Sequence, residues 1–142
     1  MKRIRRSELC GFAILIALSA ATAAADDFAI TPTFTDTFRW SVQIGSAAAE
    51  INPPLYLARG QSYSFAVSTT GSHPFYIKTA NSTGTANAYV SGSLSDNAVT
   101  TSETVTFDVP QDAPDLLFYN CGVHASMAGA IDIVVFRDGF GD

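Results

Sequence analysis

Apolar side chains recur at every second position along much of the chain. The alternation is clearest in three segments, namely Tyr63/Phe65/Val67, Val105/Phe107/Val109 and Ile131/Ile133/Val135. Because successive side chains of a strand point to opposite faces, each segment is predicted to turn one row of apolar side chains toward a shared core. This pattern is typical of antiparallel β-sheet.

Gly, Pro, Asn and Asp interrupt the apolar runs and predict turns between strands. The predicted strands span residues 34–44, 55–57, 62–67, 75–79, 89–94, 104–109, 116–121 and 130–136. Seven or eight strands of this kind form two packed sheets, so the predicted fold class is an all-β sandwich. The region 80–102 has weak periodicity and is rich in Thr, Ser, Asn and Ala, which predicts a short helix or an excursion loop beside its one strand.

The first 25 residues predict an export signal. Four basic residues between positions 2 and 6 precede an apolar stretch at 9–18, and a run of small residues ends at Ala25, after which we place cleavage. The apolar stretch is too short to cross a bilayer of about 30 Å. We therefore expect residues 1–25 to be removed, and residues 26–142 to form one domain in the periplasm or elsewhere outside the cytoplasm, without stable membrane insertion.

Removal of residues 1–25 leaves four basic and twelve acidic residues, a net charge of −8. This charge argues against nucleic acid as a partner. It favours solubility, and it is also suited to steering the protein toward a basic partner surface.

A single cysteine, Cys121, remains after the signal, so no intramolecular disulfide can form. In an oxidising compartment such a thiol is buried and inert, paired with another chain, or bound to a metal. Cys121 is followed at intervals of three by His124 and Met127, and residues three apart can face one another in a tight turn. Gly122 and Gly129 are expected to supply backbone freedom at the ends of this segment.

The fourth candidate, His73, lies 48 residues before Cys121 at the head of another predicted strand. It completes the site if its strand lies beside the strand that ends at Cys121. Together with His124 and Met127, these residues are all the histidine, cysteine and methionine that the chain contains beyond residue 25. Taken singly, a Cys or Met in a β-sandwich is most often core filler, and a His is most often a hydrogen-bonded structural residue. Taken together, their spacing favours a soft metal.

The donor set indicates which metal. A thioether is a poor ligand for zinc, whereas two imidazoles and a thiolate with a weak axial thioether form the blue-copper arrangement. Such a site suits exchange between Cu(I) and Cu(II) with little movement of the ligands. Single-electron transfer is the function predicted from it.

These residues resemble the cupredoxins, the family of plastocyanin, amicyanin and pseudoazurin. The resemblance rests on the short loop Cys-x-x-His-x-x-Met, on Tyr119-Asn120-Cys121 before it, and on Met-x-Gly-x-Ile at residues 127–131. It implies a cupredoxin-like Greek-key β-sandwich of seven to eight strands. It also implies one copper ion per chain, held by His73, Cys121, His124 and Met127. In the family the ring edge of the residue matched by His124 lies in an apolar patch where redox partners dock, and we place Val123, Ala125 and Pro74 in that patch. We expect a monomer.

Two positions depart from the family. Pro74 follows His73 where the family commonly has Asn, whose backbone N–H donates to the cysteine sulfur, and proline has no N–H to donate. The resemblance then implies a lower reduction potential or an altered copper geometry. Pro114-Asp115 replaces the Pro-Gly that precedes the family's penultimate strand, and here we expect only a different turn.

Three functions remain open from the sequence. The first is an electron carrier, the second is a copper-handling protein, a chaperone or scavenger that uses the same residues, and the third is a metal-free adhesion or ligand-binding sandwich. An enzyme is not predicted, because no histidine is spare for use as a base and no second metal set is present.

Overall fold

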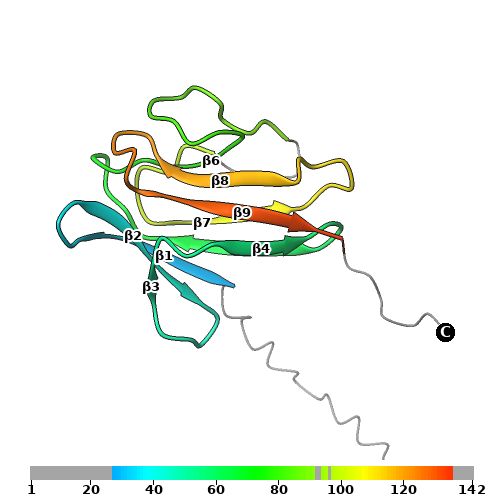
Figure 1. Cartoon of the computed structure of the whole chain (residues 1–142), viewed down its shortest axis with the longest axis horizontal. Coiled ribbons are helices and arrows are strands. Elements are labelled where there is room, and N and C mark those ends of the chain that lie inside the picture. Colours follow the sequence, from blue (N-terminus) through cyan, green and yellow to red (C-terminus); the bar gives the residue numbers. More distant parts are fainter. Residues whose placement is uncertain (1–26, 92–93, 96, 136–142) are drawn as a thin grey trace, which may run out of the picture.

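Two packed β-sheets make up the part of the chain that the structure, a computed structural model, describes: residues 27–91, 94–95 and 97–135 (Figure 1). The strands are β1 (Phe28–Phe34), β2 (Phe38–Ile44), β3 (Glu50–Ile51), β4 (Leu55–Ala58), β5 (Ser62–Val67), β6 (Phe75–Lys78), β7 (Glu103–Asp108), β8 (Leu116–Cys121) and β9 (Ala128–Val134). One sheet has the order β3-β2-β1-β5-β7 and the other β4-β9-β8-β6. The predicted all-β, cupredoxin-like sandwich is confirmed, with nine strands in the described residues where seven to eight were predicted. The predicted signal, residues 1–25, lies outside the described residues.

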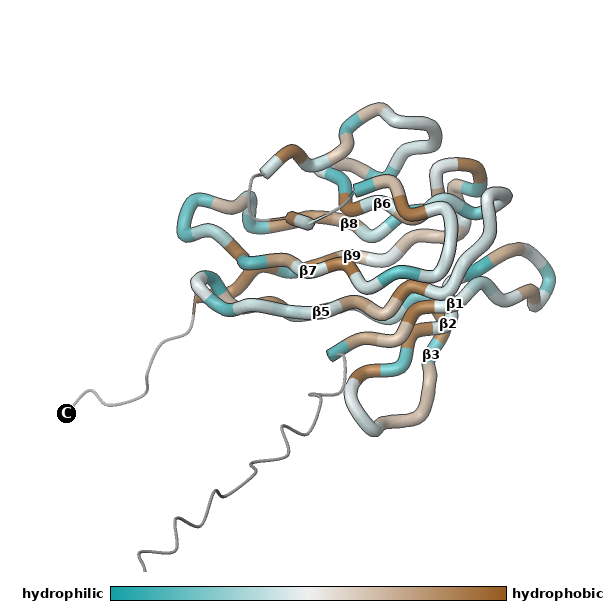
Figure 2. The backbone as a smooth tube through the Cα atoms, turned by 180° about the vertical axis from the view of Figure 1, so that it is seen from behind, coloured by the Kyte–Doolittle hydropathy of each residue, from teal (hydrophilic) through white to brown (hydrophobic). Residues whose placement is uncertain are grey.

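The two sheets share one hydrophobic core. Trp40 and Phe65 from the first sheet are fully buried, as are Phe75 and Tyr119 from the second. The rings of Trp40 and Phe75 meet edge to face across the sheets, with 5.7 Å between centroids. Burial of each such side chain contributes about 1.5–3 kcal/mol, so alternating apolar positions are the main source of stability. Figure 2 shows these hydrophobic positions recurring along the strands.

The register of the second sheet brings distant segments together. In the antiparallel pair β6–β8, Phe75 lies opposite Cys121. In the pair β8–β9, Asn120 lies opposite Ala128, so residues 122–127 form the connection of a hairpin. The residues just before β6 therefore lie beside this connection, as the sequence analysis required for His73.

Tyr119 and Gly129 lie opposite each other in β8 and β9. The Tyr119 hydroxyl donates a hydrogen bond of 2.6 Å to the carbonyl oxygen of Pro53. Burial raises the pKa of Tyr119 well above its usual range, which keeps the phenol protonated as a donor. A Cβ at Gly129 would overlap the Tyr119 ring, so the glycine is needed for close approach.

Some predicted strand boundaries were wrong. The segment 34–44 was predicted as one strand, but β1 ends at Phe34 and β2 begins at Phe38, because the polar residues between them form a hairpin turn. The strands β1 and β3 were not predicted, although residue 34 fell within a predicted strand. Residue 136, the predicted end of the last strand, lies outside the described residues.

The predicted strand at 89–94 is absent from the described residues of that region. The region makes isolated bridges instead: Ala88, just before this segment, pairs with Lys78, and Leu94 pairs with Phe107. The Asn97 side chain occupies the free edge of β6: its Oδ1 accepts a hydrogen bond from the Ile77 amide, and its Nδ2 donates to the Ile77 carbonyl. An excursion loop, one of the two alternatives for this region, is therefore confirmed. Within the described ranges, no helix is long and apolar enough to cross a membrane.

Candidate metal centre

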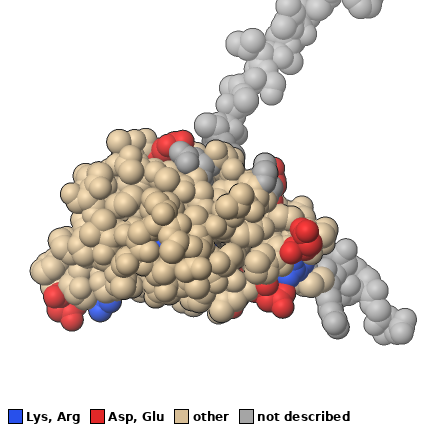
Figure 3. Space-filling model, turned by 90° about the horizontal axis from the view of Figure 1, so that it is seen from above, with Lys and Arg blue, Asp and Glu red and all other residues tan. Residues whose placement is uncertain are grey.

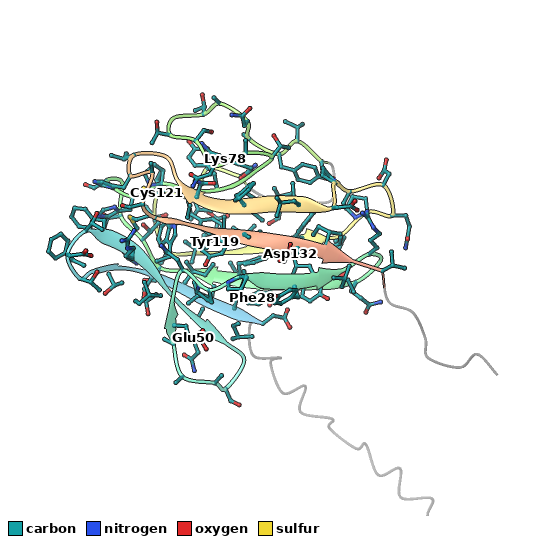
Figure 4. The ribbon with its side chains drawn as sticks, in the orientation of Figure 1. Phe28, Glu50, Lys78, Tyr119, Cys121 and Asp132 are labelled. Carbon is teal, nitrogen blue, oxygen red and sulfur yellow. The ribbon has the colours of Figure 1, made fainter. Side chains whose placement is uncertain are left out.

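His73, Cys121 and His124 meet at one end of the sandwich. Their ligand atoms all lie within 4.8 Å of one another. The two imidazole Nδ1 atoms are 3.1 Å apart, and the Cys121 Sγ lies 3.7 Å from Nδ1 of His124. Figure 4 shows Cys121 at the end of β8, where the chain enters the hairpin connection. The convergence predicted from sequence is confirmed for these three residues.

The hairpin connection is a tight turn closed by its own backbone. The Cys121 amide donates to the Met127 carbonyl at 2.8 Å, and the Met127 amide donates to the His124 carbonyl at 3.0 Å. The amides of Val123 and His124 both point at the Cys121 Sγ, at 3.3 and 3.4 Å. Hydrogen bonds to a charged acceptor are stronger than neutral ones, so these two amides suit the sulfur of a metal-bound cysteine.

His73 is held in place by the segment before it. Its amide donates to the Thr70 carbonyl at 2.8 Å, and the Thr69 hydroxyl donates to the His73 carbonyl at 2.6 Å. Burial lowers the pKa of His73, and the positive charge of protonated His124 lowers it further. Both effects favour the neutral imidazole, which is the form that binds metals.

Phe38, which the sequence analysis did not identify, covers both imidazoles. The centroid of its ring lies 4.7 Å from that of His73 and 4.6 Å from that of His124. The ring of Phe34, at the end of β1, meets Phe38 edge to face at 5.1 Å and is largely exposed. No sequence signal separates Phe38 from the other aromatic residues of the chain, since its place over the site depends on a hairpin that was predicted as one strand.

Ser126 anchors the hairpin connection at residues 122–127, hereafter the ligand turn, to the other sheet. Its carbonyl accepts hydrogen bonds from Asn52 Nδ2 at 2.8 Å and Arg39 Nη1 at 3.2 Å. Its hydroxyl donates to the Phe38 carbonyl at 2.8 Å. These contacts span 74 to 88 positions in the sequence, which is why local patterns did not reveal them.

The two glycines near the ligands have a different role from the predicted one. Neither Gly122 nor Gly129 has the positive φ that requires glycine. A Cβ at Gly122 would come within 2.8 Å of the Tyr76 ring and 3.1 Å of the Pro74 ring. Both glycines therefore permit close packing, and the expectation of backbone freedom was wrong.

The other predicted residues lie around this cluster. Met127 is fully buried at the end of the same turn, and its role as the fourth ligand stays a prediction. Val123 and Ala125 are exposed, and Pro74 is half-buried. One thiolate and two imidazoles do not suit calcium or magnesium and do suit a soft or borderline transition metal such as copper. The His-Cys-His group is thus positioned to bind a metal ion.

Comparisons with known proteins find similarity in structure only, since no family model and no curated protein sequence matches the chain. A rusticyanin variant shares 15% identity with a TM-score of 0.44, over 75% of this chain and 76% of that one. A purple cupredoxin from Nitrosopumilus maritimus shares 12% identity with a TM-score of 0.39, over 57% of this chain and 77% of that one. The multicopper oxidase McoA from Aquifex aeolicus shares 19% identity with a TM-score of 0.45, over 78% of this chain. The chain spans only 27% of that oxidase.

A β-sandwich with a His-Cys-His group at one end is what the resemblance described in the sequence analysis implies. Both features are present in the described chain. The structure is therefore consistent with that family.

Proposed function

We propose that this cupredoxin-like protein is a type 1 blue copper electron carrier, with one copper ion held by His73, Cys121, His124 and Met127. The observation that carries the proposal is the approach of the His73, Cys121 and His124 ligand atoms to within 4.8 Å of one another. Bound copper would supply the Cu(I)/Cu(II) couple. The chain's contribution is to hold the donors and to exclude water from them.

The contacts that hold the candidate ligands favour one fixed geometry. Cys121 is the last residue of β8, His124 lies in a turn closed by two backbone hydrogen bonds, and Ser126 ties that turn to the opposite sheet. When a site holds its ligands in one arrangement for both oxidation states, little reorganisation is needed and electron transfer is fast. This rigidity favours an electron carrier over a site that must open.

The surface around His124 supports a role in brief encounters. His124 is half-buried, and its neighbours Val123 and Ala125 are exposed. Figure 3, seen from above the view of Figure 1, shows that the face on the side of β6 and β8 carries few charged side chains, most of them at its edges. An apolar contact of small area suits a transient complex with a redox protein. We accordingly propose an exported, monomeric, non-enzymatic carrier that binds its partners through the surface around His124.

The experiment is copper loading of residues 26–142. The Cu(II) protein should show an intense visible thiolate charge-transfer band and the paramagnetic resonance spectrum of a copper–thiolate site. Cys121→Ser should abolish the band, whereas Ser46→Ala, at a turn in the other sheet, should leave it unchanged. A colourless one-to-one Cu(II) complex of the unmodified protein would falsify the proposal.

A copper-handling protein is the second candidate, because Pro74 lacks the N–H of its family counterpart. It predicts tight Cu(I) binding, ready transfer to an acceptor, and no reversible Cu(I)/Cu(II) couple. A reversible Cu(I)/Cu(II) couple in voltammetry of the copper-loaded protein would contradict this candidate. Absence of copper after reconstitution at neutral pH would instead favour the metal-free binding module.

A further inference from the structure

Lys78 is completely buried. It ends β6, opposite Phe118 of the neighbouring strand β8, and none of its surface is exposed. It is also the sole lysine of the sequence after Lys2. Lysine is almost never fully buried without a partner, because removal of an ammonium group from water is costly. Its position therefore requires an explanation.

The ammonium group is satisfied by backbone carbonyls and an aromatic ring. Lys78 Nζ donates hydrogen bonds of 2.7 Å to the carbonyls of Ser82 and Gly84, and it lies 5.0 Å from the centroid of the Tyr76 ring. No ion pair involving Lys78 is found in the described part of the chain. The positive charge of Lys78 is thus buried without an ion-pair partner among the described residues.

The two carbonyls belong to the loop at residues 79–89, which lies above β8 in Figure 1. The amide of Gly84, at the tip of this loop, donates 2.6 Å to the carbonyl of Gly122, the residue after Cys121. In a second hydrogen bond, Asn120 Nδ2 donates to Asn81 Oδ1 at 2.7 Å. Lys78 therefore fixes the loop at residues 79–89, and this loop contacts Gly122, the first residue of the ligand turn.

Lys78 and Cys121 also interact through charge. Figure 4 shows Lys78 on the same side of the molecule as Cys121, below the loop. Burial lowers the pKa of Lys78, while the negative charge of the Cys121 thiolate raises it. Because both side chains are fully buried, salt screens such an interaction little.

We propose that Lys78 is a positioning residue that fixes the 79–89 loop on Gly122, and that its buried charge raises the reduction potential of the copper site. The inference rests on the proposed function. Oxidation adds one positive charge to the site, and a nearby cation in a medium of low dielectric constant disfavours that addition. Cu(I) is favoured as a result. This effect opposes the lower potential that the resemblance implied for Pro74.

The first test compares Lys78→Met with Lys78→Arg in the copper-loaded protein. We expect Lys78→Met to retain the thiolate band, to have a lower reduction potential, and to exchange the Gly84 and Gly122 amide hydrogens faster. Lys78→Arg, which keeps the charge, should have a potential closer to that of the unmodified protein. An unchanged or higher potential in Lys78→Met would overturn the inference.

A second variant separates charge from position. Gly84 has a φ of +68°, so Gly84→Ala strains the loop backbone by about 1 kcal/mol. The added Cβ meets no other atom within 4 Å. We expect it to speed amide exchange at Gly122 but to lower the potential less than Lys78→Met. A fall as large as that of Lys78→Met would show that loop position alone sets the potential, which contradicts the charge effect.

If Lys78→Met does not fold, a measurement on the unmodified protein still tests the inference. By thermodynamic reciprocity, a cation that disfavours oxidation must itself be more acidic in the oxidised protein. Carbon-detected titration of Lys78 Cε should therefore give a lower pKa with Cu(II) than with Cu(I), and equal values would overturn the inference. Absence of the thiolate band in the unmodified protein would instead overturn the proposed function.

Discussion

The amide nitrogen of Gly122 donates a hydrogen bond of 2.8 Å to the carbonyl oxygen of Pro74. Each of these residues directly follows a candidate ligand, Cys121 or His73, so the bond joins the two halves of the site. Pro74 lacks a donor but supplies this acceptor. The thiolate draws its amide donors from Val123 and His124 within the turn instead. The site thus keeps two N–H donors to sulfur despite the proline.

Pro74→Ala restores an N–H beside the site. We expect the potential to rise, because an additional donor to the thiolate disfavours Cu(II), and we expect the visible band to persist. The greater freedom of the unfolded chain should reduce stability by no more than about 1 kcal/mol. Voltammetry and denaturant unfolding measure the two effects. A potential that falls or stays the same would show that residue 74 contributes no donor.

Met127→Leu tests the fourth ligand. The exchange conserves volume in a fully buried position, so the free energy of unfolding of the copper-free protein should fall by less than about 1.5 kcal/mol. If the thioether is an axial ligand, its loss removes a donor that stabilises Cu(II), and the potential should rise while the band persists. An unchanged potential and resonance spectrum would assign Met127 to core packing alone.

Gly129→Ala tests the close contact between β8 and β9. The added Cβ would overlap the ring of Tyr119, which is fully buried and hydrogen-bonded to Pro53 and so cannot swing away. Overpacking of this kind should lower the free energy of unfolding by about 2–3 kcal/mol, as measured with urea. Gly71→Ala is the matched control, since its Cβ meets nothing within 4 Å. It should change stability by less than about 0.5 kcal/mol. Equal stability of the two variants would contradict the close-packing role.

The convergence of His73, Cys121 and His124 was predictable from sequence because most of their spacing is local. Cys121 and His124 are three positions apart at the end of an alternating strand, and one assumption about strand pairing added His73. Phe38 and Ser126 were not predictable, because they reach the site through contacts across the two sheets. Lys78 was equally hidden, since its burial depends on a loop whose path is set by side-chain hydrogen bonds rather than by periodicity.

Phe38→Ala tests whether the aromatic cover retains copper. The ring lies against His73 and His124, so its removal admits water to both imidazoles and frees their orientation. Changes in groups that orient metal ligands weaken metal binding by about 10-fold or more, and we expect loss of copper to a competing chelator to accelerate to that extent. Phe34→Ala is the control, because Phe34 is 64% exposed and no ring contact joins it to either histidine within the described residues. If both variants release copper at the rate of the unmodified protein, the ligand turn alone retains the metal and the β1–β2 hairpin has no part in the site.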